Sequence, residues 1–372
     1  MFLRMLALLI TIVLVLVVAV AVTYAERKVA AFIQDRLGPT EVGPYGMLQS
    51  VMDVLKLLQK EDVIPAAADK RLFALAPILI FAAVLAGFAV VPLTPSYIPS
   101  GISLGVFYLL AIISLDVIGL MMAGWGSNNK FAMLGAIRSV AQIVSYEIPA
   151  GLAILSVVMI SQSLDLQAIS FQQGILINSF PGYEGARNYL FGLKFTGVDV
   201  TAVGGILTWN IVRMPFMLLG FIIYYIASLA ESNRAPFDIP EAESELVAGF
   251  HVEYSGFRFA ALFLAEYAMM FLVTLVAAIL FLGSWNTPLP NFGPVELATW
   301  TTGTPGALSG TLWGLFWLLS KALLLQFTQL WVRWTFPRLR VDQLMHLCWK
   351  VLTPLALLLV LLCGVWRLLM VG

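Results

Sequence analysis

Eight apolar stretches, each long enough to cross a lipid bilayer, constrain this 372-residue chain more than any other feature. About 20 apolar residues in a helix span the hydrocarbon core, where each backbone polar group needs a partner within the protein. We therefore expect eight transmembrane helices, at approximately 4–25, 72–92, 102–124, 131–160, 207–230, 256–283, 309–334 and 347–370. With 60% hydrophobic and 11% charged residues, the chain has too little polar surface for a soluble fold.

The expected fold is an all-α integral membrane protein with a single membrane domain over 1–372. The first apolar run, Met5–Ala25, resembles a secretory signal, but it is followed by the charged triplet Glu26-Arg27-Lys28 instead of a cleavage site with small residues. We interpret it as a retained span.

Basic residues give the orientation. Fifteen of the 21 Lys and Arg residues lie in four segments, namely 26–71, 125–138, 231–258 and 333–350. The positive-inside rule places these segments in the cytoplasm. An even number of spans then puts both termini on the outer side, together with the long loop 161–206, for which the sequence indicates no role.

The rare residue types exclude several classes of site. A net charge of zero gives no reason to expect nucleic acid. The only cysteines are Cys348 and Cys363, and the only histidines are His251 and His346. They form no metal-ligand pattern, so we expect no iron–sulfur cluster, zinc or haem to be held by this chain.

The segment 44–60 predicts an amphipathic helix in the membrane interface. Its polar residues recur at helical spacing, opposite an apolar stripe: Gln49, Asp53, Lys56 and Lys60. Packing against a partner subunit is the alternative. Just before it, the charged segment 26–39 could contact lipid headgroups, or form a polar floor under a membrane-facing crevice.

Four carboxylates or amines lie well inside expected spans, where each costs roughly 2.5–3.5 kcal/mol on insertion scales. They are Asp116, Glu147, Glu266 and Lys321. They indicate either a proton relay or a structural ion pair, for example between a glutamate and Lys321. Beside Glu147, Pro149 cannot donate to the Ser145 carbonyl, which leaves an acceptor for water.

A cytoplasmic loop at about 231–255 concentrates carboxylates, and they continue towards Glu266 in the next span. The loop carries Glu231, Asp238, Glu241, Glu243, Glu245 and Glu253. Asp238 and Glu241 predict a capped helix that starts near Pro240 and stops at Gly249. The carboxylates form either a solvated acidic face or a funnel into the membrane.

Long stretches of this chain resemble one family. They include ERKVAAFIQDRLGP from residue 26, GWGSNNK from 124, SYEIP from 145, AESNRAPFDIPEAESE from 230, AEY at 265–267 and WVRWTFPRLR from 331. They resemble the H-type membrane subunit of proton-pumping NADH:quinone oxidoreductase, or respiratory complex I, which is called subunit 1 in mitochondria. Asp116 departs from the family pattern, where a small or neutral residue is expected.

The resemblance implies a quinone chamber whose opening to the membrane is framed by the first span, the interfacial helix and the sixth span. The chamber residues would be Gln34, Arg36, Asp62, Arg234 and Phe237. The proton path would use Glu147, Glu231, Glu241, Glu243, Glu245, Glu253, Glu266 and Lys321. A further hypothesis is that Glu241, Glu243 and Glu245 sense quinone chemistry electrostatically.

The resemblance also implies partners and location. Quinone would be the substrate, no cofactor would be bound by this chain, and FMN and iron–sulfur clusters would lie in partner subunits. Those partners would be the hydrophilic-arm quinone-module subunits and the small and antiporter-like membrane subunits. The expected location is the bacterial inner membrane. The alternatives are the related membrane subunit of an energy-converting hydrogenase, a secondary transporter and a membrane anchor.

Overall fold

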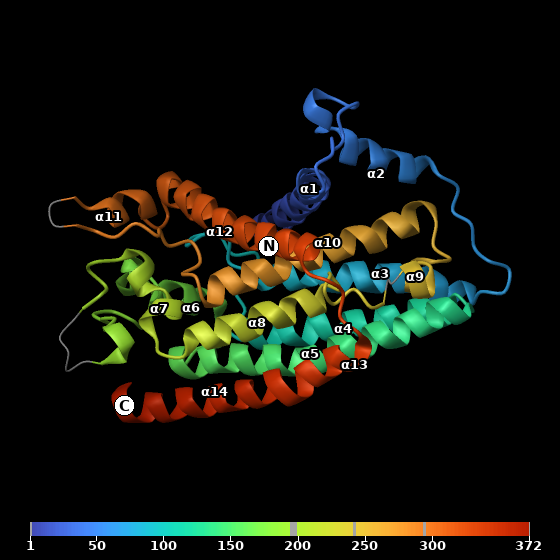
Figure 1. Ribbon diagram of the computed structural model, residues 1–372. Coiled ribbons are helices and arrows are strands. Elements are labelled where there is room, and N and C mark those ends of the chain that lie inside the picture. The colour runs from blue at the N-terminus through green and yellow to red at the C-terminus, as the bar shows by residue number, and fades with distance from the viewer. Residues whose placement is uncertain (1, 194–198, 241–242, 293–294, 372) are drawn as a thin grey trace.

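The computed structural model describes residues 2–193, 199–240, 243–292 and 295–371, and within them the chain is helical, with isolated bridges in place of strands (Figure 1). Seven helices in this part are long and apolar enough to cross a membrane. They are α1 (Phe2–Ile33), α3 (Lys70–Gly87), α4 (Gly105–Gly126), α5 (Lys130–Ser161), α10 (Gly256–Leu280), α12 (Leu308–Thr335) and α14 (Thr353–Trp366), which continues α13 (Val341–His346). The shorter ones are α2 (Gln49–Gln59), α6 (Leu166–Gln172), α7 (Asn210–Arg213), α8 (Met217–Glu231), α9 (Glu243–Leu246) and α11 (Leu297–Thr302).

In the structure the expected span 207–230 is interrupted. Instead of one helix, this segment forms the short α7 and the 15-residue α8, separated at Met214, Pro215 and Phe216. Pro215 has no N–H for a helical bond, and Phe216 adopts a left-handed backbone (φ 69°), so the helix must restart. At 1.5 Å per residue α8 is about 22 Å long, shorter than the hydrocarbon core.

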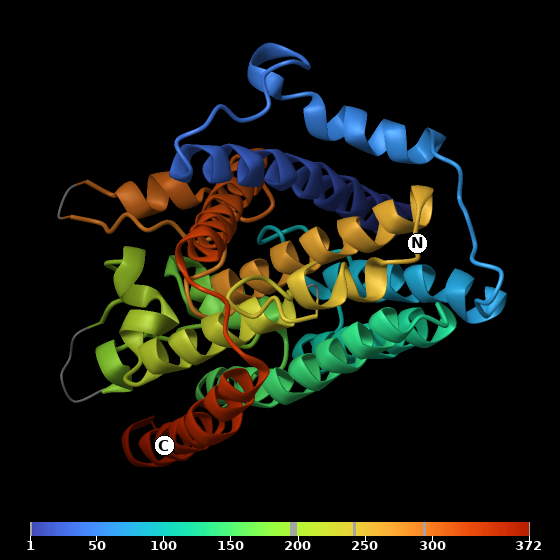
Figure 2. The ribbon, with the colours of Figure 1, turned by 45° about the vertical axis from the view of Figure 1, so that its right-hand side comes forward.

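Helix α10 is the centre of the bundle. It packs against α1, α2, α3, α8 and α12, and it is the most buried of the seven long helices. Figures 1 and 2 show α1 and α2 on one side of it and α5 and α14 on the other. Its residues from Tyr267 onwards are buried on all sides, which explains why it lacks an amphipathic pattern.

The proline in α5 is accommodated by the last long helix. Pro149 frees the carbonyl of Ser145, and the thiol of Cys348 donates to that oxygen at 3.0 Å. The carbonyl of Ser145, which we expected to be open to water, therefore accepts a hydrogen bond from the protein itself. Cys348 lies in a π-helical turn, Leu347–Leu352, just before Pro354 interrupts the regular bonding at the start of α14.

The interfacial helix is shorter than expected, and α2 starts at Gln49 instead of near residue 44. Tyr45 and Gly46 both have positive φ values, 54° and 76°. A Cβ on Gly46 would lie 2.1 Å from the carbonyl oxygen of Pro39, so the tight turn requires glycine there. Because of this turn, α2 begins only at Gln49.

Part of the loop 161–206, together with α7, closes the end of α10. Gln173 Nε2 donates to the carbonyl of Ile279 at 2.7 Å, and Asn210 Nδ2 donates to that of Leu280 at 2.8 Å. The last carbonyls of a helix have no partner within it. Residues far apart in the sequence therefore complete the hydrogen bonding of the central helix.

Candidate functional site: an apolar crevice and a chain of carboxylates

An apolar crevice of about 290 Å³ lies between α1, α2 and α10, with Phe81 of α3 contributing one wall. Its lining is mainly apolar and includes Val20, Val54, Phe259 and Phe263. These are the three elements that the family resemblance placed around an opening to the membrane. Such a crevice suits a long apolar molecule that arrives from the lipid.

An ion pair holds α2 against α1 at the edge of this crevice. Arg27 Nη1 lies 2.5 Å from Asp53 Oδ2, and Gln49 Nε2 donates to Asp53 Oδ1 at 3.2 Å. Partial burial alone would raise the pKa of Asp53, but these hydrogen bonds and the charges of Arg27 and Lys56 outweigh it and lower that pKa. Asp53 therefore stays ionised under mildly acidic conditions.

Tyr267 forms the inner end of the crevice and connects it to a buried charge cluster. Its hydroxyl donates to Glu26 Oε2 at 2.6 Å, and Glu26 also pairs with Arg333. The guanidinium of Arg234 lies 4.3 Å from the centre of the Tyr267 ring. The polar floor considered from the sequence thus involves Glu26, which reaches residues from α10 and α12.

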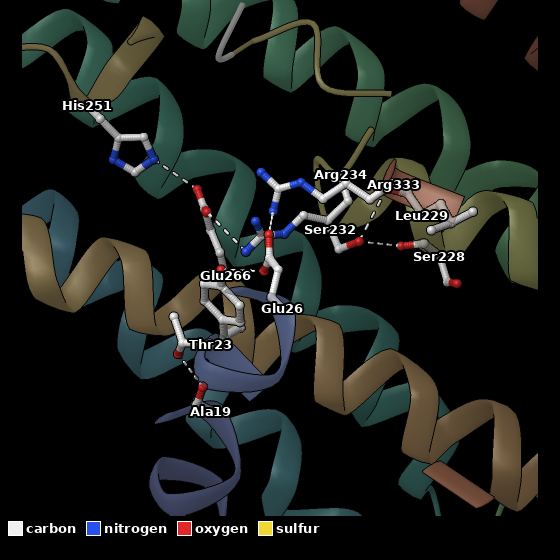
Figure 3. Close-up of polar contacts among 11 residues, drawn as sticks. Ala19, Thr23, Glu26, Ser228, Leu229, Ser232, Arg234, His251, Glu266 and Arg333 are labelled. Atoms are coloured by element: carbon white, nitrogen blue, oxygen red, sulfur yellow. Dashed lines mark hydrogen bonds and ion pairs between the residues drawn. The ribbon is translucent and has the colours of Figure 1, made fainter. Parts of the chain in front are cut away.

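Glu266, the neighbour of Tyr267 on α10, is held by an imidazole and a guanidinium (Figure 3). Its Oε1 lies 2.9 Å from His251 Nε2, and its Oε2 lies 3.7 Å from Arg234 Nη2. The exposed fractions are 14% for Glu266, 7% for His251 and 5% for Arg234, so water screens the cluster little. Glu266 belongs to α10, His251 to the turn before α10, and Arg234 to the loop after α8.

Behind Glu266 lies a small cavity of about 20 Å³, shared with Asp116 and Glu231. A space of roughly 10–15 Å³ already holds a water molecule if polar partners are present. Asp116 Oδ1 is buried and has no hydrogen-bond partner among the residues that the structure describes. Asp116 interacts electrostatically with Glu266, and Glu231 with both Asp116 and Glu147. The cavity can therefore hold a water that links three carboxylates.

Glu147 continues the series at the side of the molecule. It accepts a hydrogen bond of 2.7 Å from the hydroxyl of Ser114, which bridges α5 to α4. It also lines a lateral groove of about 400 Å³ with apolar residues such as Phe107 and Leu155. A carboxylate in an otherwise apolar lateral groove is the point where a proton could leave this chain for a neighbour.

Two of the described loop carboxylates have partners on other elements. Glu245 Oε2 lies 2.6 Å from Arg138, whose hydrogen bond and charge lower the pKa of Glu245. Glu253 accepts from Asn129 at 2.6 Å. Within the described residues, the part of the chain expected to be helical up to Gly249 contains α9, which ends at Leu246. Glu241 and the side chain of Glu243 lie outside the described part of the chain.

The expected chamber residues lie in different surroundings, some exposed and some buried. Arg36 donates to Gln34 at 2.7 Å in an exposed segment beyond α1, and Asp62 pairs with Arg258 at 3.2 Å. Phe237 is 3% exposed and packs edge-on against Tyr146, with ring centres 5.4 Å apart. Of the five chamber residues, Arg234 is the one in the Glu266 cluster, and it contacts the crevice through Tyr267.

Lys321 lies apart from the carboxylates. Its ammonium donates to the carbonyls of Ser284 and Asn286, at 2.8 and 2.6 Å, and lies 4.2 Å from the centre of the Trp209 ring. The ion pair with a glutamate, considered from the sequence, is absent from the described part of the chain. The buried charge is balanced by backbone dipoles and an aromatic face.

Sequence reasoning missed several members of the cluster. His251 could be taken for a lone interfacial histidine. The shared partner of Tyr267 and Arg333 could not be identified, because Glu26 and Arg333 are 307 residues apart, and Tyr267 and Glu26 are 241 apart. The available signal was that Tyr267 directly follows Glu266, an unexplained charge inside an expected span.

Comparisons with known proteins show the family. The model of the NADH dehydrogenase family matches residues 5–364. The second H-type NADH-quinone oxidoreductase subunit of Cytophaga hutchinsonii is 61% identical over 345 residues, which cover 93% of this chain and 94% of that protein. The H-type subunit of Chlorobium luteolum is 51% identical over 344 residues, or 92% and 83% of the two chains. That of Chlorobaculum tepidum is 50% identical over 343 residues, or 92% and 86%.

Proposed function

This chain belongs to the NADH dehydrogenase family, together with the H-type subunits of NADH-quinone oxidoreductase, and from that premise we propose that it is the membrane subunit of a proton-translocating respiratory complex I. In this role it forms the membrane opening of the quinone chamber and the start of a proton path. Its partners are the hydrophilic-arm and membrane-arm subunits of the same complex, in a bacterial inner membrane.

The apolar crevice supports the part of the proposal that concerns quinone. A quinone with an isoprenoid tail is too apolar to arrive through water, so it must enter from the lipid through a gap between helices. The crevice between α1, α2 and α10 offers such a gap, and Tyr267 at its inner end leads to Arg234. The four Cys and His residues of the chain supply no cluster-ligand set, so electrons reach the quinone from a partner subunit.

The position of Glu266 is the observation that carries the proton path. On one side it contacts His251 and Arg234, which lie behind the crevice wall. On the other it lines the cavity with Glu231 and Asp116. From there Glu147 leads to the lateral groove. Reduction of a quinone takes up two electrons and two protons, and coupled carboxylates respond to such a change of charge with linked protonation.

The alternative, a subunit of an energy-converting hydrogenase, explains the carboxylates equally well. It does not require an apolar crevice open to the lipid. The crevice, together with relatives that are named quinone oxidoreductase subunits, favours the quinone function.

The test replaces Glu266 by glutamine in the assembled complex. Glu266→Gln keeps the size and one hydrogen bond to His251 but removes the ionisable group. We expect proton translocation in sealed vesicles to fall on the order of 100-fold, the scale of a lost proton-transfer group. Quinone reductase activity is measured in the same vesicles.

The matched control is Glu184→Gln, because Glu184 is an exposed carboxylate of the outer loop. It should leave translocation at the wild-type rate. If Glu266→Gln assembled normally and still pumped at that rate, Glu266 would not be part of the path.

A further inference from the structure

A polar pocket of about 310 Å³ lies at the end of the bundle that holds α6, α7 and the C-terminus (Figure 1). It is far from the crevice and the carboxylate chain in the fold. Three arginines line it, from three separate parts of the chain: Arg187 of the outer loop, Arg213 of α7 and Arg367 at the end of α14. Its described lining residues include no carboxylate.

Arg213 is a buried cation that no carboxylate neutralises within the described chain. It is 3% exposed. It donates to the carbonyl of Gln172 at 2.8 Å, to Asn210 Oδ1 at 3.3 Å and to Asn188 Oδ1, which are all uncharged acceptors. Its Nε is buried and has no hydrogen-bond partner among the described residues. Burying a charge without a counter-charge is costly, so this geometry favours an anion in the pocket.

The other two arginines add to the excess of positive charge. Arg213 and Arg367 lie close enough for their charges to repel. Arg187 has a partial counter-charge in Asp199, at 3.8 Å. A planar guanidinium binds two oxygens of one phosphate in parallel, and several arginines around one pocket are a common arrangement for that group.

The surroundings point to a lipid as the source of the phosphate. The residues after Arg367, Leu368 and Leu369, are 80% and 72% exposed at the end of an apolar helix. Trp366 donates its indole N–H to the carbonyl of Phe191 at 2.9 Å, and tryptophan is typical of the bilayer–water boundary. We propose that this pocket binds the phosphate of a phospholipid headgroup in the leaflet around the end of α14.

The test measures phospholipid that stays bound to the purified complex. Arg367→Gln is the first variant, because Arg367 is only partly buried and lies in the last turn of the chain. After delipidation in detergent, the complex is titrated with nanodisc or micellar phosphatidylglycerol, and bound lipid is counted by native mass spectrometry. We expect roughly tenfold weaker binding in Arg367→Gln, as for a lost charge-assisted hydrogen bond, and partial recovery in Arg367→Lys.

Two further arms decide the outcome. Arg71→Gln removes an exposed arginine at the start of α3 and should bind phosphatidylglycerol as the wild type does. Inorganic phosphate at millimolar concentration should compete weakly. Equal lipid binding by Arg367→Gln and the wild type would overturn the proposal, and so would full displacement of the lipid by inorganic phosphate. Neither lipid-binding result depends on proton pumping. The lipid proposal and the proposed function are therefore tested independently of each other.

Discussion

The surroundings of Asp116 suit a carboxyl group that exchanges protons. They suit a purely structural carboxylate less well. A structural carboxylate normally accepts several hydrogen bonds, whereas Asp116 Oδ1 accepts none from the described residues and shares a cavity with two other carboxylates. A water molecule in that cavity would be its natural partner. Sequence comparison alone gave no reason for an aspartate there, and the cavity supplies one.

We therefore predict that Asp116→Asn lowers the ratio of protons translocated to quinone reduced, by roughly tenfold if the path runs through this residue. The amide keeps the size of the side chain but cannot carry a proton between Glu266 and Glu231. The ratio is measured by a pH-sensitive dye in vesicles that hold the assembled complex.

Asp116→Glu is the control, because it keeps the ionisable group and should retain most of the wild-type ratio. A wild-type ratio in Asp116→Asn would show that the path bypasses this residue.

At the level of elements, the crevice between α1, α2 and α10 makes a prediction about substrate length. Ala260 of α10 lines it, so Ala260→Trp would fill part of its volume. We expect KM for a long-tailed quinone to rise several-fold while KM for a short-tailed analogue changes little, because the tail occupies the crevice. Steady-state quinone reduction with both substrates checks this.

The control for that variant is Val17→Trp, since Val17 is 60% exposed on α1 and is not among the residues that line the crevice. It adds the same bulk outside the crevice. If Ala260→Trp changed both KM values equally, the tail would not lie between these helices.

The contact between α1 and α2 gives a prediction about pH. The pKa of Asp53 is lowered by Arg27 and Gln49 against the effect of burial, so the ion pair stabilises the contact above the ordinary aspartate pKa of about 4. That stability is lost as the pH falls through the lowered value. The protection of the α2 amides against hydrogen exchange, relative to the intrinsic exchange rate at each pH, should therefore fall only below about pH 4 in the wild type.

Asp53→Asn removes the ionisable partner, so α2 should exchange faster already at pH 7 and show no acid transition. A transition of the same midpoint in this variant would mean that another group controls the docking of α2.

The elements themselves were predictable to very different degrees. Long apolar runs such as the one in α10 are easily recognised in the sequence, because no soluble fold can bury so many consecutive apolar residues. The interruption of the expected span 207–230 was missed because hydropathy does not register that Pro215 breaks the helix. The start of α2 at Gln49 was missed because positive φ values at Tyr45 and Gly46 depend on the fold around them.

The candidate site could also be predicted only in part from the sequence. Glu266 and Glu147 could be identified from the cost of burying charge in an apolar run. Their partners could not, because His251, Arg234 and Ser114 approach them only through the packing of separate helices. A single sequence shows which charged residues are present, but it does not show which of them form pairs.

For the whole molecule, the distribution of basic residues predicts which loops face the cytoplasm. Glu184→Cys, in the outer loop, should react with a membrane-impermeant maleimide on intact spheroplasts. Lys130→Cys should react only after permeabilisation. Both positions are exposed, and the native Cys348 and Cys363 are buried and should stay unlabelled. Reversed labelling would invert the orientation given by the positive-inside rule.

Glu147 has a consequence for the life of the newly made chain. Its lateral groove is apolar apart from this carboxylate, which has the hydroxyl of Ser114 as its partner. In the proposed complex a neighbouring subunit would cover this groove, so an unassembled copy would hold a half-buried carboxylate at an apolar face until that contact forms. We therefore expect the unassembled chain to be less stable in the membrane than the assembled subunit.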